Sequence, residues 1–73
     1  MHNLAQIQNK VNFLKRQLSR KPLVENFGDR AQMLLSQYIG DIYAYSYEDR
    51  LKINVITGEF FDWCSTYTGG EIR

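Results

Sequence analysis

Residues 43–67 decide the fold of this chain, and they read YAYSYEDRLKINVITGEFFDWCSTY. One pattern in this segment is alternation, which is typical of strands that are buried on one face. The alternating positions are Tyr43, Tyr45 and Tyr47, then Leu51, Ile53 and Val55, and, after a turn at Thr57-Gly58, Phe61, Trp63 and Tyr67. Because β-branched and aromatic residues favour strands, this pattern predicts a three-stranded β-meander.

The same segment also predicts one long helix over residues 47–68. Apolar residues recur there at spacings of three and four, namely Ile53, Ile56, Phe60, Trp63 and Tyr67, with Val55 and Cys64 widening the stripe. Ser46 is a typical N-cap with Asp49 in the first turn, and Gly69-Gly70 is expected to end the helix in a left-handed turn. Gly58 and the β-branched residues oppose this helix, each by a few tenths to about 1 kcal/mol. The residues alone leave the two interpretations open.

The first half of the chain predicts two helices. The first covers about residues 3–20, with Asn3 and Gln6 as a capping box and Pro22 beyond its end. Its apolar stripe is Leu4, Ile7, Val11, Leu14 and Leu18. The second covers about residues 27–39, with Asn26 as its N-cap and Gly40 as its stop. Its apolar face is Phe27, Ala31, Leu34, Leu35 and Tyr38.

The length and the composition of the chain limit the classes of protein to which it can belong. With 73 residues it forms a single small domain, 1–73, whose core is thin. It has no apolar run long enough to span a membrane and no basic-then-apolar start typical of a secretory leader. The single cysteine indicates a reducing compartment, and we expect a cytoplasmic location. The net charge of +1 divides into +4 over residues 1–37 (6 − 2) and −3 over residues 38–73 (3 − 6).

Groups for catalysis or metal binding are scarce, so we expect neither an enzyme nor a cofactor. His2 and Cys64 are the only thiol–imidazole pair, and His2 lies beside a terminus that we expect to fray. Cys64 is interpreted as a small buried hydrophobic residue. One histidine and one cysteine are too few for a closed zinc site, and the carboxylates lack calcium-loop spacing.

Two short motifs resemble a known group of proteins. They are Glu25-Asn26-Phe27-Gly28 followed by Arg30, Leu34 and Tyr38, and Phe61-Asp62-Trp63-Cys64 followed by Tyr67 and Gly69. This arrangement resembles small uncharacterised proteins encoded by bacteriophages and other mobile elements, over roughly residues 20–70. The resemblance implies that the last segment is helical and that the source is a phage, although the β-branched run from Ile53 to Thr57 departs from the pattern. We therefore expect an all-α, up-down-up bundle of three helices, with two helices followed by a β-meander (α+β) as the alternative.

Four tyrosines crowd the segment that joins the second helix to the third, a connector over about residues 40–46. Tyrosine is enriched in interfaces because it gives a large contact area at low entropic cost. The leading hypothesis is a non-enzymatic, phage-encoded protein that binds and inhibits a host protein, such as a defence or regulatory factor of the infected bacterial cell. Its predicted contact residues are Tyr38, Asp41, Tyr43, Tyr45, Tyr47 and Glu48, with the carboxylates suited to a basic partner. The alternative interpretation of the tyrosines is that the small core needs aromatic bulk.

A second hypothesis uses the basic end of the first helix. Lys15, Arg16, Arg20 and Lys21 would neutralise a few phosphates in a small nucleic-acid-binding accessory factor. A third hypothesis is self-association into a homo-oligomer, because two apolar seams at 3-4 spacing on one small chain would also pair between copies.

Overall fold

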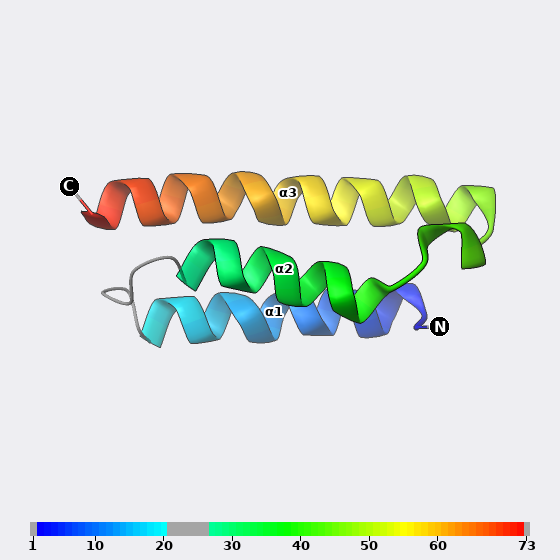
Figure 1. Ribbon diagram of the computed structural model, residues 1–73, viewed down its shortest axis with the longest axis horizontal. Helices are drawn as coiled ribbons and strands as arrows, with labels where there is room; N and C mark the ends of the chain where they lie inside the picture. Colours follow the sequence, from blue (N-terminus) through cyan, green and yellow to red (C-terminus); the bar gives the residue numbers. More distant parts are fainter. Residues whose placement is uncertain (1, 21–26, 73) are drawn as a thin grey trace.

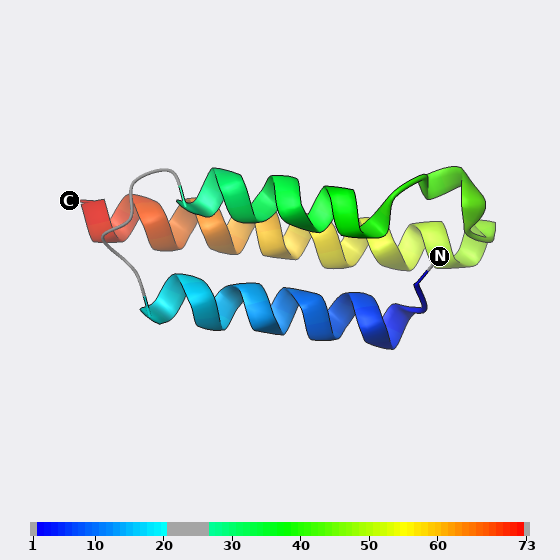
Figure 2. The same ribbon diagram turned by 60° about the horizontal axis from the view of Figure 1, so that its bottom comes forward.

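The protein is a bundle of three helices in up-down-up order (Figures 1 and 2). The computed structural model describes residues 2–20 and 27–72, and the side chains of residues 2–19 and 28–66. Helix α1 is Leu4–Arg20, α2 is Phe27–Ile39 and α3 is Tyr47–Ile72. Because the described residues contain no strand, the predicted all-α bundle is confirmed and the β-meander is not supported. The bundle measures 40 × 16 × 16 Å.

The start of α1 is fixed by a reciprocal capping box. The Gln6 main-chain N–H donates to Asn3 Oδ1 at 2.8 Å, and the Asn3 main-chain N–H donates to Gln6 Oε1 at 2.9 Å. The stripe predicted for this helix is its buried face, where Ile7, Val11, Leu14 and Leu18 are almost fully buried. Both the cap and the stripe are therefore confirmed; Pro22 lies outside the described residues.

Helix α2 ends at Gly40, as predicted. Gly40 has φ +74°, and its N–H donates to the Ser36 carbonyl at 3.0 Å, which is a left-handed C-terminal cap. Ala31, Leu35 and Ile39 form the buried face, whereas Leu34, predicted for that face, is exposed. The predicted cap Asn26 lies outside the described residues.

A single turn of 3₁₀ helix, η1 (Ile42–Ala44), crosses from α2 to α3 at one end of the bundle (Figure 1). Asp41 caps it by accepting a hydrogen bond from the Tyr43 N–H at 3.0 Å. Ser46 then caps α3, since its Oγ accepts from the Asp49 N–H at 3.2 Å. Two side-chain caps thus fix the backbone of the connector. The predicted cap at Ser46 is confirmed.

The β-branched run lies inside α3. The Thr57 hydroxyl donates to the Ile53 and Asn54 carbonyls of the preceding turn, so this polar group is satisfied within the helix. Helix α3 also continues to Ile72, four residues beyond the predicted end. Gly69 and Gly70 therefore lie within the helix, and the predicted left-handed turn there is wrong.

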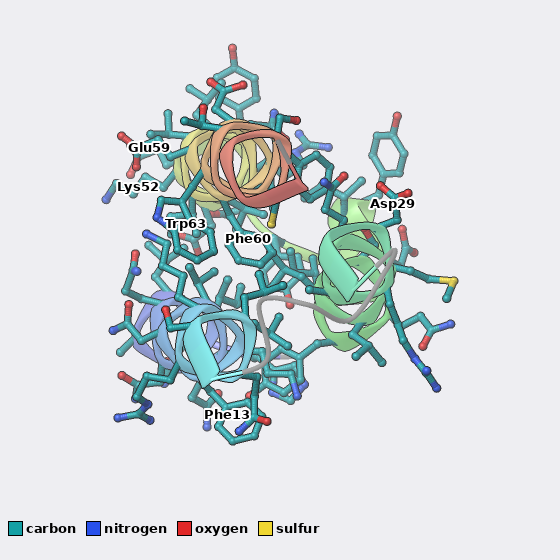
Figure 3. All side chains as sticks on the ribbon, turned by 90° about the vertical axis from the view of Figure 1, so that its left-hand side faces the viewer. Phe13, Asp29, Lys52, Glu59, Phe60 and Trp63 are labelled. Carbon is teal, nitrogen blue, oxygen red and sulfur yellow. The ribbon has the colours of Figure 1, made fainter. Side chains whose placement is uncertain are left out.

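Phe60 is the largest of the fully buried side chains and lies between the three helices (Figure 3). Its ring packs nearly parallel to that of Trp63, with centroids 6.3 Å apart, and Trp63 extends toward α1. Ile53 and Cys64 complete the buried face of α3. Val55, expected to widen this stripe, is instead exposed on the opposite side of the helix.

Candidate protein-binding surface

The tyrosines around the connector divide into three environments. Tyr43 is 78% exposed and Tyr47 is 67% exposed, the two largest exposed fractions among the large hydrophobic side chains that the structure describes. Tyr45 is buried, and Tyr38 is half-buried. The sequence predicted one contact surface that included all four, and the structure brings only Tyr43 and Tyr47 together on an exposed surface.

Tyr45 belongs to the core. Its hydroxyl donates to the Ile39 carbonyl at 3.0 Å and accepts from the His2 main-chain N–H at 3.3 Å. A ring that is buried and bonded in this way cannot contact a partner without local unfolding. The prediction that Tyr45 is a contact residue is therefore corrected.

Tyr38 lies in a separate cluster between α1 and α2. The His2 imidazole stacks on its ring with centroids 3.8 Å apart, and the Lys10 ammonium lies 5.3 Å from the ring centroid. The same ammonium lies 5.3 Å from the centroid of Phe13. His2, expected to fray, instead contacts Tyr38 and Tyr45.

Arg50 joins the two exposed tyrosines. Its guanidinium carbon lies 5.4 Å from the Tyr43 ring centroid and 5.7 Å from that of Tyr47, within the range of cation–π attraction. An open depression of about 260 Å³ lies beside this group. It is lined by Ile42, Tyr43, Tyr47, Arg50, Leu51 and Asn54, and we call this set the tyrosine corner.

The predicted carboxylates adjoin residues of the tyrosine corner in the sequence, because Asp41 precedes Ile42 and Glu48 follows Tyr47. Asp41 is exposed but also has a local role, as the cap of η1. Glu48 is exposed in the first turn of α3, where a negative charge is favoured by the helix dipole. Residues 40–50 carry Asp41, Glu48 and Asp49 against Arg50, a net charge of −2 (1 − 3).

The exposed apolar surface continues along α3. Tyr47, Leu51 and Val55 follow one another at intervals of four residues, and Val55 is 59% exposed. Asn54 and Gly58 lie among them and are also exposed. We call Tyr47, Leu51, Asn54, Val55 and Gly58 the outer face of α3. Sequence reasoning missed Arg50 and the outer face, although the spacing 47-51-55 was a visible signal.

The basic end of α1 is partly used within the domain. The Lys15 ammonium lies 5.4 Å from the Trp63 ring centroid, so this cation packs against α3. Arg16 is exposed. The Arg20 side chain and Lys21 lie outside what the structure describes. Nucleic-acid binding by this end of the helix stays a prediction.

Cys64 has the environment of a packing residue. Burial raises the pKa of its thiol to about 11, although a hydrogen bond with Gln32 and the nearby Lys15 charge act in the opposite direction. A thiol that stays protonated at neutral pH is a poor nucleophile. Its interpretation as a small buried hydrophobic residue is confirmed by its burial. Within the described part of the chain, no three His, Cys, Asp or Glu side chains are grouped as metal ligands would be.

No helix in the described residues combines the length and the apolar character that crossing a membrane requires. Comparisons of the chain with protein-family models, with curated proteins and with solved structures find no match.

Proposed function

We propose that this chain is a non-enzymatic protein-binding protein that contacts its partner through the tyrosine corner and the outer face of α3. The observation that carries the proposal is the exposure of Tyr43 and Tyr47 on either side of one arginine, with the apolar residues of α3 continuing from them. Tyrosine and arginine are, with tryptophan, the residues enriched among the energetically dominant positions of interfaces.

The local order of the corner supports this proposal. Asp41 and Ser46 fix the backbone on either side of Tyr43, and the Arg50 guanidinium restrains both rings. A surface that is ordered before binding loses less conformational entropy when the partner docks. Phe13 on α1 and Met33 and Leu34 on α2 are also exposed, but they do not line the depression at the tyrosine corner.

The charge around the corner favours a partner surface with an apolar centre and a basic rim. Asp41, Glu48 and Asp49 would meet that rim, whereas Arg50 is engaged with the tyrosine rings. The sequence suggested a more specific function, namely that a phage-encoded chain inhibits a host defence or regulatory protein. This function stays a prediction.

A site-specific cross-linking experiment tests the proposal. A photo-reactive amino acid is placed at Tyr43 or at Tyr47 in the full chain, and a third protein carries it at Phe13 as a matched control on α1. After irradiation in nuclease-treated lysate of the source cell, we expect a discrete protein adduct from the first two positions and none from Phe13. The double variant with Tyr43→Ser and Tyr47→Ser, checked for an unchanged circular-dichroism spectrum, should lose the same partner in an affinity capture.

Equal adducts from all three positions would contradict the proposal, because they would indicate non-specific contact. Recovery that disappears with nuclease would instead favour the nucleic-acid hypothesis.

A further inference from the structure

Helix α3 is apolar on two opposite sides. Its buried side carries Ile53, Phe60 and Cys64. With successive residues turned by about 100°, the residues of the outer face lie roughly 100–160° away from that side. A helix on the surface of a domain needs one apolar stripe, and the other side is normally polar. The second apolar stripe of α3 has no role in the core, so we expect it to pack against another molecule.

The molecule as a whole is more extended and exposes more surface than a compact domain of its size. Its accessible surface is 5165 Å², against about 4,700 Å² for a typical monomer of 8.6 kDa. The radius of gyration is 12.6 Å, against about 11 Å for a compact domain of this length. Beside Gly58, an added Cβ would meet no atom within 4 Å, so a second helix can approach the backbone there.

We infer that the outer face of α3 binds the same face of a second copy of this chain, with the two α3 helices antiparallel. This inference goes beyond the proposed function, because it adds a second copy of the chain as a partner of the outer face. A two-fold axis near Ile56 would place Leu51 and Asn54 of one copy against the segment around Gly58 of the other. The same patch is then used twice, as in most symmetric dimers.

The charges on one flank of the outer face select this orientation. Lys52 and Glu59 project from the same flank of α3 (Figure 3). In an antiparallel pair the midpoint of these two positions falls on the two-fold axis, so Lys52 of each copy faces Glu59 of the other. In a parallel pair the two-fold axis runs along the helices and puts this flank of each copy on opposite edges of the interface, so Lys52 and Glu59 would have no such opposite-charge contacts. The charges on this flank are therefore complementary to those of a second copy, which favours a second copy over an unrelated partner.

Sedimentation equilibrium of the full chain over a range of concentrations tests the inference. We expect a monomer–dimer equilibrium with a Kd on the order of 10–100 µM, because the apolar patch is small. Val55→Glu places two negative charges near the two-fold axis and should weaken the dimer by at least about 100-fold. Met33→Glu is the matched control, because Met33 is 55% exposed on α2 and Val55 is 59% exposed on α3. It should leave the Kd unchanged.

A charge exchange then tests the orientation. Lys52→Glu and Glu59→Lys should each weaken the dimer by roughly tenfold, because each introduces two like-charge contacts. The double variant Lys52→Glu/Glu59→Lys should restore the original Kd within about twofold, since it restores both opposite-charge contacts.

Three results would overturn the inference. The first is a chain that stays monomeric up to about 500 µM. The second is a dimer that is weakened by Met33→Glu but not by Val55→Glu. The third is a double charge variant in which the losses of dimer affinity from the two single variants simply add. A monomeric chain that still gives a discrete adduct with another protein from Tyr47 would refute the second copy but leave the proposed function standing. A monomeric chain with no adduct would refute both.

Discussion

The phenol oxygen of Tyr45 lies 3.0 Å from the carbonyl oxygen of Ile39, to which it donates a hydrogen bond. Ile39 is the last residue of α2, where carbonyl groups lack partners within the helix. The same phenol oxygen accepts from the His2 N–H, so one hydroxyl ties the start of α1 to the end of α2. Tyr45 thereby closes the end of the bundle on which the tyrosine corner is built.

Removing this hydroxyl should destabilise the domain without opening a large cavity. We expect Tyr45→Phe to cost about 1–2 kcal/mol, because the buried Ile39 carbonyl loses its donor. For a domain of this size the melting temperature should fall by roughly 5–10 °C, as measured by circular dichroism. Tyr43→Phe is the control: its ring is 78% exposed, so the melting temperature should not change. Equal melting temperatures for the two variants would contradict the assigned role of Tyr45.

Two glycines should respond to alanine in opposite directions. Gly40 has φ +74°, where a Cβ is strained, so Gly40→Ala should lower the free energy of unfolding by about 1–2 kcal/mol. Gly58 lies within α3 with open space where the Cβ would be, so Gly58→Ala should raise it by about 0.5–1 kcal/mol. Urea denaturation at low micromolar protein concentration measures both. A loss of stability in Gly58→Ala would show that the site is less open than the structure indicates.

The helix ends that sequence could predict are those with local signals. The Asn3–Gln6 box, the Gly40 cap and the Ser46 cap all act within four residues, and each is formed as expected. The choice between helix and strands for the last third was harder because propensity and apolar spacing disagreed there. In the helix, the Thr57 hydroxyl is satisfied by carbonyls of its own preceding turn. The helix end predicted at Gly69 and Gly70 was wrong because a glycine permits a helix to end but does not require it.

The candidate surface was harder to predict than the fold. Tyr43 and Tyr45 are alike in type and two residues apart, yet one is exposed and the other is buried. What separates them is the Ile39 carbonyl, which accepts the Tyr45 hydroxyl only when α2 and the connector are in place. The contact of Arg50 with the rings of Tyr43 and Tyr47 likewise depends on η1, which places Tyr43 beside the start of α3.

The Cys64 thiol should be almost inert in the native state. Raising its pKa from 9.0 to about 11 lowers the thiolate fraction at pH 8 by roughly 100-fold. Alkylation by iodoacetamide should therefore be slower than in the urea-unfolded chain by at least that factor. A native rate within about tenfold of the unfolded rate would contradict the burial of the thiol.

The same shift in the pKa of Cys64 should make stability depend on pH at the alkaline end. The native state holds the thiol proton more tightly than the unfolded state, so the stabilisation is complete below pH 9.0 and is lost as the pH rises toward about 11. Cys64→Ala removes the titrating group. The difference in unfolding free energy between the original protein and Cys64→Ala should therefore be constant up to about pH 8.5 and shrink above it. A constant difference up to pH 11 would exclude this linkage.

Truncation of Phe60 should be the most damaging single change in the core. The ring is fully buried between the three helices, and its loss should cost about 3–5 kcal/mol. A domain of 73 residues has about 4–11 kcal/mol of stability in total, so Phe60→Ala should remove at least about a quarter of it and lower the urea midpoint accordingly. Phe13→Ala is the matched control on the exposed side of α1 and should cost about 1 kcal/mol or less. Trp63 fluorescence reports the difference directly, because its ring packs on Phe60 and its emission should shift to the red only in Phe60→Ala. Similar urea midpoints for the two variants would mean that Phe60 does not hold the three helices together.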